Sequence, residues 1–345
     1  MWTFLEPLNL SRYLIVQRVN TSLVRMPRCL ATEISLVLGA SIANRLPTRE
    51  AHAWQKSLAL WDNYGGVSVV GKKKTKKIPV DVSWPIEAVF FVYPGKLAYG
   101  QGEMILWELK LMGAGADHNV FLEIILPALE EAGFASDTPW RGSTTLWGHY
   151  DIRAVYAARG NQWEPVVEKG RLDLRYRATP LQWTEGLDFE SGTKRSFERM
   201  TWVTPFDLSE MPGQKTERYR RGRSNRPHKN KGIPQNEVPS LRGILEALML
   251  RVSQLLPGKY NTPEDAWEIV GAEEQFNLTY ALEQVSHIPM QGYQLTQAPK
   301  EWPGRWIGYQ TFASIPQTII PYLQLASILH IGKQTHLGCG TFRIE

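Results

Sequence analysis

The sequence predicts an α+β protein built from two consecutive β-α-β-β-α-β units, each with an antiparallel sheet. Three observations support this prediction. The chain has 345 residues, enough for about two domains. Apolar residues make up 43% and charged residues 21%, which is ordinary for globular proteins. Strand-like and helical periodicities follow one another in the same order in the two halves. This order is typical of ferredoxin-like units, which include the RRM-like RNA-recognition scaffold.

The first unit is expected over residues 1–160. Its strands are indicated by β-forming residues, and its helices by apolar residues that recur every three or four positions. Pro47 ends a first helix over 28–46, and Thr48 can cap a second helix over 49–61. The other elements expected here are strands at 12–19, 67–70, 88–93, 103–112 and 146–156 and a helix at 119–132.

The second unit is expected over residues 166–345. It repeats the order of the first unit, although the two halves share no obvious sequence identity. A polar segment at 184–238 is expected to be irregular because of its charge and its Pro, Gly, Ser and Asn content. The elements expected around it are strands at 171–177, 306–312 and 341–344, strand material at 268–288, and helices at 239–256 and 319–329.

Positive charge is concentrated in two segments, although the net charge is only +5. The segment 215–231 is expected to be a flexible loop and holds eight cations against one acid, Glu217. Such residues suit RNA backbone phosphates, whereas the alternative is a solvated linker or a nuclear-import-like patch. The RNA-binding candidates in these segments are Arg218, Arg220, Arg221, Arg223, Lys229 and Lys231, and Lys72, Lys73 and Lys74 from the lysine run at 72–77.

The two cysteines, Cys29 and Cys339, lie at opposite ends of the chain. Two isolated cysteines form neither a zinc site nor a disulfide framework, and they fit a reducing cytosol. No signal-peptide pattern and no run of 18 apolar residues is present. We therefore expect a cytoplasmic protein that needs no membrane, metal or other cofactor.

A glycine-rich loop at 331–340 lies between an apolar helix and the final strand. Gly332, Gly338 and Gly340 tolerate positive φ, and together with Lys333 they make a plausible phosphate cradle. The alternative is a tight turn with no ligand. The spacing fits neither the dinucleotide fingerprint nor the P-loop, because the lysine follows the first glycine.

The segments WIGY at 306–309, IPYLQLA at 320–326 and HIGKQTHLGCG at 330–340 resemble the tail of the CRISPR repeat-RNA-processing endoribonucleases of the RAMP superfamily. Every glycine and the lysine of that tail match. The segments LKLMG at 109–113 and LDLRYRATPL at 172–181 are similar to upstream parts of the family. The resemblance covers roughly 85–345, whereas residues 1–84 match poorly.

The resemblance implies metal-independent cleavage of precursor CRISPR RNA within its repeats. The 2′-hydroxyl attacks its own phosphate, giving a 2′,3′-cyclic phosphate and a 5′-hydroxyl, and the protein keeps the processed RNA. The implied partners are CRISPR repeat RNA and other CRISPR effector subunits. Gly332, Lys333, Gly338 and Gly340 would belong to the family's RNA-contacting loop.

The family places its catalytic histidine on or just after the first helix, with lysine or tyrosine nearby. His52 is the one histidine in that region, and Lys56 lies one turn further along the same helix face. That face is opposite a stripe formed by Trp54, Leu58 and Trp61, so we expect it to be exposed. The alternative for His52 is a solvated surface residue. The other candidate histidines are His336 and His228, whereas His118, His149, His287 and His330 are interpreted as capping, packing or surface residues.

Two other classes of function stay open at this point. One is a catalytically silent RAMP subunit that binds CRISPR RNA inside an effector complex, which the poor match of residues 1–84 favours. The other is a general RNA-binding or RNA-modifying protein of ferredoxin-like type, because a fold alone does not determine function.

Overall fold

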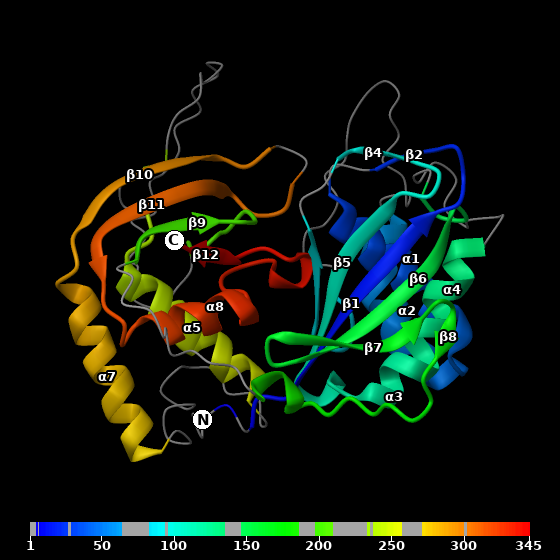
Figure 1. Ribbon diagram of the computed structural model, residues 1–345, viewed down its shortest axis with the longest axis horizontal. Coiled ribbons are helices and arrows are strands. Elements are labelled where there is room, and N and C mark those ends of the chain that lie inside the picture. Colours follow the sequence, from blue (N-terminus) through cyan, green and yellow to red (C-terminus); the bar gives the residue numbers. More distant parts are fainter. Residues whose placement is uncertain are drawn as a thin grey trace. The chain divides into compact units, whose positions relative to one another are not determined.

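The chain forms two compact units in a computed structural model (Figure 1). One unit is Leu8–Leu187, and the other combines Met1–Pro7 with Asp188–Glu345. The structure describes residues 5, 7–26, 29–63, 83–93, 96–134, 146–185, 197–209, 233–234, 237–256, 271–299 and 302–345, without the side chains of 59–63.

The first unit is built on a six-stranded antiparallel sheet in the order β3-β5-β1-β6-β7-β8. The first and third strands of a β-α-β-β-α-β unit, β1 and β5, lie in the middle, with β3 and β6 beside them. This is the strand order of a ferredoxin-like unit, extended at one edge by β7 and β8. The strands are β1 (Leu10–Val19), β3 (Ala88–Val92), β5 (Met104–Met112), β6 (Tyr150–Arg159), β7 (Gln162–Glu168) and β8 (Arg171–Leu172), and β2 (Leu23–Arg25) pairs separately with β4 (Ala98–Gly100).

Helices cover one face of this sheet (Figure 1). Side chains alternate between the two faces of a strand, so Tyr13 and Ile15 of β1 point into the core and are fully buried. Tyr13 stacks on Phe121, with ring centroids 3.8 Å apart. The helices are α1 (Leu30–Arg45), α2 (Thr48–Asn63), α3 (His118–Val120) and α4 (Leu126–Phe134), and a π-helical turn at Phe121–Ile125 joins the last two.

The second unit has a four-stranded antiparallel sheet in the order β10-β11-β9-β12, which is again the ferredoxin-like order. Helices α5 and α8 lie together on one face of this sheet (Figure 1). On the same side, Trp202 stacks on Phe206 at 3.9 Å, and Leu323 of α8 is fully buried. The elements are β9 (Phe197–Trp202), α5 (Leu241–Leu255), α7 (Ala272–Ser286), β10 (Met290–Gln297), β11 (Trp306–Ile315), α8 (Ile320–Leu329) and β12 (Phe342–Ile344).

The predicted α+β class with two ferredoxin-like units is confirmed. The elements predicted for the middle of the chain, around residues 171–238, were wrong. The expected strand 171–177 is only Arg171–Leu172, and it pairs with β7 of the first sheet. The chain then turns at Asp173, whose carboxylate accepts a hydrogen bond from the Arg175 amide. The first strand of the second unit is instead β9, inside the segment expected to be irregular. The division between the units accordingly falls at 187/188, later than the expected 160–166.

The strand material expected at 268–288 is also wrong, because residues 272–286 form α7. Leu278, Ala281 and Val285 are the buried residues of this segment. Their spacing of three and four residues places all three on one face of a helix, whereas a strand would bury every second residue. The expected strand at 67–70 lies outside the described residues. None of the helices in the described ranges combines the length and apolarity needed to cross a membrane.

Replacing Leu323 with alanine tests the role of α8 in the second core. Because Leu323 is fully buried, the change should lower the free energy of unfolding by about 2–5 kcal/mol. The matched change Leu174→Ala removes a side chain that is 70% exposed and should cost no more than about 0.5 kcal/mol. Urea unfolding followed by tryptophan fluorescence measures both, and equal losses would contradict the packing of α8.

Candidate functional site

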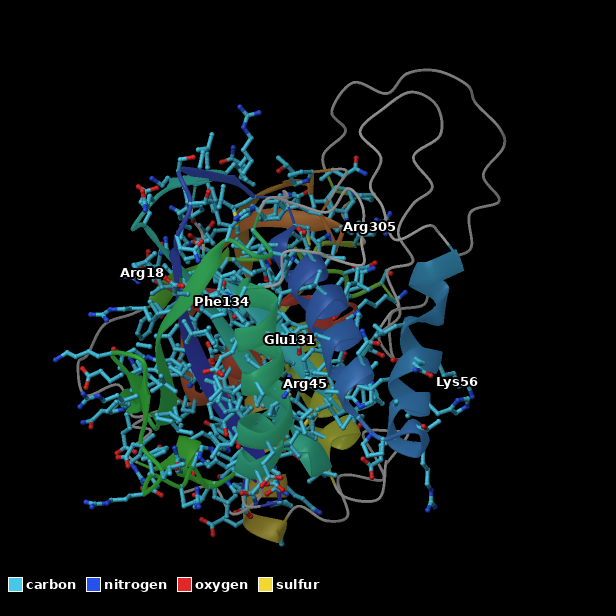
Figure 2. The ribbon with its side chains drawn as sticks, turned by 90° about the vertical axis from the view of Figure 1, so that its right-hand side faces the viewer. Arg18, Arg45, Lys56, Glu131, Phe134 and Arg305 are labelled. Atoms are coloured by element: carbon cyan, nitrogen blue, oxygen red, sulfur yellow. The ribbon has the colours of Figure 1, made fainter. Side chains whose placement is uncertain are left out.

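His52 and Lys56 lie one turn apart on the exposed face of α2. On the opposite face, Trp54 and Leu58 are buried, and Trp54 packs against Trp84 with ring centroids 5.0 Å apart. Figure 2 shows Lys56 extending outward from the helix. The prediction that His52 and Lys56 lie on an exposed face, opposite a buried stripe, is therefore confirmed for the side chains that the structure describes. Among those residues, neither His52 nor Lys56 has a hydrogen-bonding partner.

The glycine-rich loop at 331–340 connects α8 to β12 and packs against a neighbouring segment of the same unit. The Lys333 amide donates to the Asp207 carbonyl, and the Gly340 amide donates to the Pro205 carbonyl, both at 2.9 Å. Gly332, Gly338 and Gly340 have φ of +95°, +79° and +81°, where glycine is favoured. These amides bind protein carbonyls, so they are not directed at a phosphate.

Two of the loop glycines are also required by close backbone contact. A Cβ atom on Gly332 would lie 2.6 Å from the Asp207 carbonyl oxygen, and one on Gly340 would lie 1.8 Å from that of Ile331. Both distances are shorter than any real Cβ contact. Folding of this loop therefore requires glycine at residues 332 and 340, independently of any ligand.

The histidines of this region differ in exposure. His330 is fully buried, and its Nδ1 lies 3.0 Å from the carbonyl oxygen of Cys339. This contact holds the start of the loop against its end, as expected for a packing residue. His336 and Lys333 are half-buried within the loop, and each makes interactions with neighbouring residues.

Gly340→Ala tests whether close contact or backbone conformation makes the glycine necessary. Gly102 is the matched control, because its φ of +84° is similar but a Cβ added there would meet no atom within 4 Å. Gly102→Ala should lower the free energy of unfolding by about 1–2 kcal/mol, the cost of the left-handed conformation. Gly340→Ala should cost clearly more, and equal losses in chemical unfolding would refute the importance of the contact.

The two basic segments of the sequence lie outside the described residues. These are Lys72, Lys73 and Lys74, and Arg218, Arg220, Arg221, Arg223, Lys229 and Lys231. His228 lies in the same undescribed part of the chain. Their contribution to RNA binding stays a prediction.

A buried charge cluster in the first sheet was missed by the sequence analysis. Glu108 of β5 is 2% exposed, and its carboxylate accepts a 2.6 Å hydrogen bond from Nε of Arg12 on β1. Lys110, also buried, adds a second positive charge. Burial alone would raise the pKa of Glu108, but the charges of Arg12 and Lys110 hold that pKa below its usual value. The signal in the sequence was an acid and a base two apart in a strand, which places both on one face.

Glu108→Gln should destabilise the first unit by about 3–5 kcal/mol, because it leaves the guanidinium of Arg12, whose side chain is only 15% exposed, without a counter-charge. In the native protein, the lowered pKa means that the contribution of Glu108 is complete above about pH 4.3 and is lost as pH falls through the folded-state pKa. The variant should therefore lose stability less steeply in acid.

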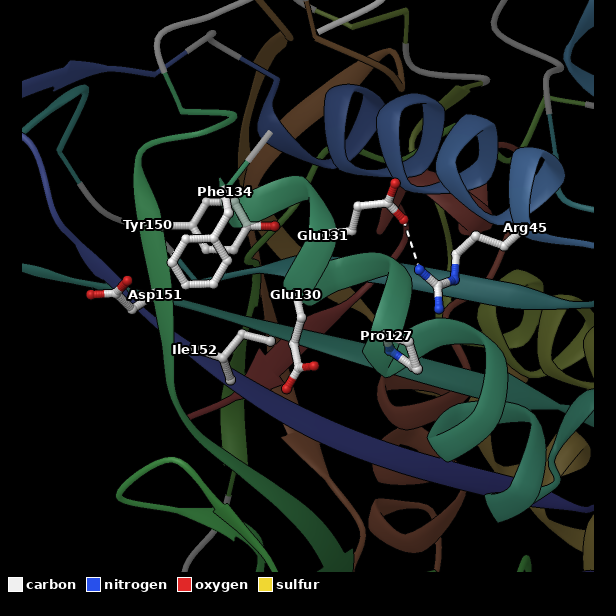
Figure 3. Close-up of a pocket in the computed structure, with 8 residues that line it drawn as sticks. All are labelled: Arg45, Pro127, Glu130, Glu131, Phe134, Tyr150, Asp151 and Ile152. Carbon is white, nitrogen blue, oxygen red and sulfur yellow. Dashed lines mark hydrogen bonds and ion pairs between the residues drawn. The ribbon is translucent and has the colours of Figure 1, made fainter. Parts of the chain in front are cut away.

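The control is the exposed ion pair between Arg45 and Glu131, with Nη1 and Oε2 2.8 Å apart (Figure 3). Glu131→Gln should change the free energy of unfolding by no more than about 1 kcal/mol. Unfolding curves from neutral to acid pH measure both variants. If Glu108→Gln costs no more than the control, the buried pair does not stabilise the sheet.

His118 is buried in the first unit, and its Nδ1 lies 2.9 Å from the hydroxyl of Tyr13. Burial lowers the pKa of His118, and the charge of Arg177 lowers it further. The imidazole is therefore neutral at neutral pH. Its Nε2 has no hydrogen-bonding partner among the described residues. We interpret His118 as a packing residue rather than an exposed base.

A hollow of about 570 Å³ lies on the first unit beside α4 and β6 (Figure 3). Its lining includes three carboxylates but only one cation, so it does not suit a polyanion such as RNA. No predicted site residue lines it. The lining residues are Arg45, Pro127, Glu130, Glu131, Phe134, Tyr150, Asp151 and Ile152.

In the described ranges, no three His, Cys, Asp or Glu side chains come together as a metal site requires.

Two ferredoxin-like units in one chain define the class of fold, and comparisons with known proteins add the following. The sequence matches no protein-family model and no curated protein. Similar solved structures include a partial Cas6-RT-Cas1–Cas2 complex, with TM-score 0.48 and 13% identity over 98% of this chain and 46% of that chain. Thermus thermophilus Cas6 gives TM-score 0.43 and 13% identity over 98% and 99% of the chains. A Cas6 product complex gives TM-score 0.45 and 14% identity over 97% and 100%.

This chain thus spans less than half the length of the chain in the Cas6-RT-Cas1–Cas2 complex. With TM-scores below 0.5 and identities of 13–14%, none of these likenesses carries a functional argument.

Proposed function

We propose that this protein is an endoribonuclease that cleaves precursor CRISPR RNA within its repeats and retains the product. The observation that carries the proposal is the position of the HIGKQTHLGCG segment, 330–340. It lies between the last helix, α8, and the last strand, β12, of the second of two ferredoxin-like units. The resemblance stated above requires this order of elements. Because the substrate is a transcript, we place the reaction in the cytoplasm.

The proposed reaction needs no metal. The 2′-hydroxyl oxygen attacks the adjacent phosphorus, the bond from phosphorus to the 5′ oxygen breaks, and a 2′,3′-cyclic phosphate and a 5′-hydroxyl are formed. One group must take the proton of the 2′-hydroxyl, and one must give a proton to the leaving oxygen. His52 is assigned to this proton transfer, because histidine is the most common general acid–base side chain and this one is exposed. Lys56, on the same exposed face, would stabilise the charge that develops on the phosphorane.

Binding of the RNA backbone is assigned to the basic residues. The cations of 215–231 and of 72–77, together with Lys333, would neutralise phosphates and release counterions. The affinity should therefore fall steeply with salt, while cleavage position depends on other contacts.

A catalytically silent subunit that binds CRISPR RNA within an effector complex is the second candidate. Two observations favour it. Residues 1–84, which include His52, resemble the family poorly. In addition, no described residue forms a hydrogen bond that would orient the His52 imidazole. Catalytic bases are normally held by such a bond, although hydrogen bonds in free enzymes are often loose.

Cleavage of the cognate repeat RNA in EDTA decides between the two candidates. His52→Ala should lower the single-turnover rate by about 10²–10⁴-fold, the usual contribution of general acid–base catalysis, with little change in RNA affinity. Lys56→Ala should also lower the rate. His287→Ala, which removes an exposed histidine from the second unit, is the matched control and should cleave normally.

A substrate with a 2′-deoxy nucleotide at the cleavage site should bind and remain intact. If the unmodified RNA also binds without being cut, the silent-subunit function replaces the enzymatic one. A fully active His52→Ala variant would instead exclude His52 as the catalytic residue.

A further inference from the structure

One face of the sheet of the second unit, the helix-free face, carries none of the helices that the structure describes. Helices α5 and α8 pack on the other face, where Met200, Trp202 and Phe312 are buried. Because side chains alternate along a strand, Thr201 and Tyr309 point to the helix-free face. The four strands therefore present a polar surface that the core does not use.

A continuous row of side chains crosses this face. The strand register places Arg343 of β12 opposite Thr201 of β9, Thr201 opposite Tyr309 of β11, and Tyr309 opposite Gln294 of β10. Opposite residues on one face have neighbouring side chains. The row thus combines a cation, a hydroxyl, an aromatic ring and an amide across the full width of the sheet.

Arg199 joins this row from β9, two residues before Thr201. Its guanidinium carbon lies 3.8 Å from the centroid of the Tyr309 ring, a close cation–π contact. The side chains of Arg199 and Arg343 are 44% and 66% exposed. A planar ligand and an anionic group can therefore reach the Arg199–Tyr309 pair and the second guanidinium together.

We infer that this helix-free face binds an unpaired nucleotide of RNA, with its base stacked on the Arg199–Tyr309 pair and its phosphate on Arg343. Bases stack on aromatic rings and on guanidinium planes, and four-stranded sheets of this kind use such residues for single-stranded RNA. Gln294, which is exposed and lies opposite Tyr309, supplies hydrogen bonds to base edges. The inference rests on the proposed RNA function and adds to it a site for single-stranded sequence.

Glu345, which follows β12, occupies the position of the phosphate. Its carboxylate lies 2.5 Å from Nε of Arg343 and 3.8 Å from Nε of Arg199. The Glu345 side chain therefore neutralises part of the positive charge of the two guanidiniums. A phosphate must displace the carboxylate, and removing its charge should strengthen binding.

Binding of a short fluorescent oligouridine to the full chain, measured by anisotropy, tests the inference. Tyr309→Ala and Arg199→Ala should each weaken binding by about 5- to 150-fold, the value of about 1–3 kcal/mol per stacked base. Tyr309→Phe keeps the ring and should bind nearly as the native chain. Glu345→Gln should bind more tightly. Tyr280→Ala, which removes an exposed tyrosine from α7, is the matched control and should have no effect.

Unchanged binding in both Tyr309→Ala and Arg199→Ala would overturn the inference, as would weaker binding in Glu345→Gln. If Tyr309→Ala fails to fold, the Arg199 and Glu345 variants decide, since both side chains are exposed. The cleavage assay separates this site from the proposed function. Oligouridine binding that depends on Tyr309, without cleavage of repeat RNA, supports the site and removes the enzymatic proposal. Cleavage of repeat RNA together with oligouridine binding that does not depend on Tyr309 supports the enzymatic proposal and removes the site.

Discussion

The second unit depends on the close approach of backbone at Gly340 to the start of its own loop. The Ile331 amide donates to the Gly340 carbonyl, and the Gly340 amide donates to Pro205. A side chain at residue 340 would occupy the position of the Ile331 carbonyl. This approach brings β12 beside β9, and so completes the sheet on which Arg343 lies opposite Thr201. Both the loop and the helix-free face of the sheet therefore rely on one glycine contact.

Local patterns predicted the helices well and the strand pairing poorly. The first two helices and α8 were predicted from the spacing of apolar residues, and Pro47 marked the end of the first helix. Both signals depend only on residues that are close in sequence. Strand β9 was missed because its evidence is not local. It is stabilised by Trp202 in the core and by pairing with β11, more than 100 residues away in sequence, whereas its own charged residues suggested an irregular segment.

The same distinction applies to the candidate residues. Helical periodicity was sufficient to place His52 and Lys56 on the exposed face of α2. The spacing of Glu108 and Lys110 was a signal in the sequence, but the pairing of Glu108 with Arg12 was not predictable. Charged side chains are rarely buried without a partner, and here a strand distant in sequence supplies it. The Arg199–Tyr309 pair was missed for the same reason, since its two members come from strands whose register only the folded sheet defines.

The glycine loop carries the sequence resemblance, yet its glycines are explained by folding. Gly332 and Gly340 meet neighbouring backbone, and the Lys333 amide is bonded to Asp207. A match in this loop is therefore stronger support for a shared second unit than for a shared reaction. It follows that RNA cleavage must be judged on α2, where His52 and Lys56 lie, and RNA recognition on the cations and on the Arg199–Tyr309 pair. Helix α2 and this pair belong to different units of the chain, so the RNA binding that we propose for the pair does not require the chemistry that we propose for α2.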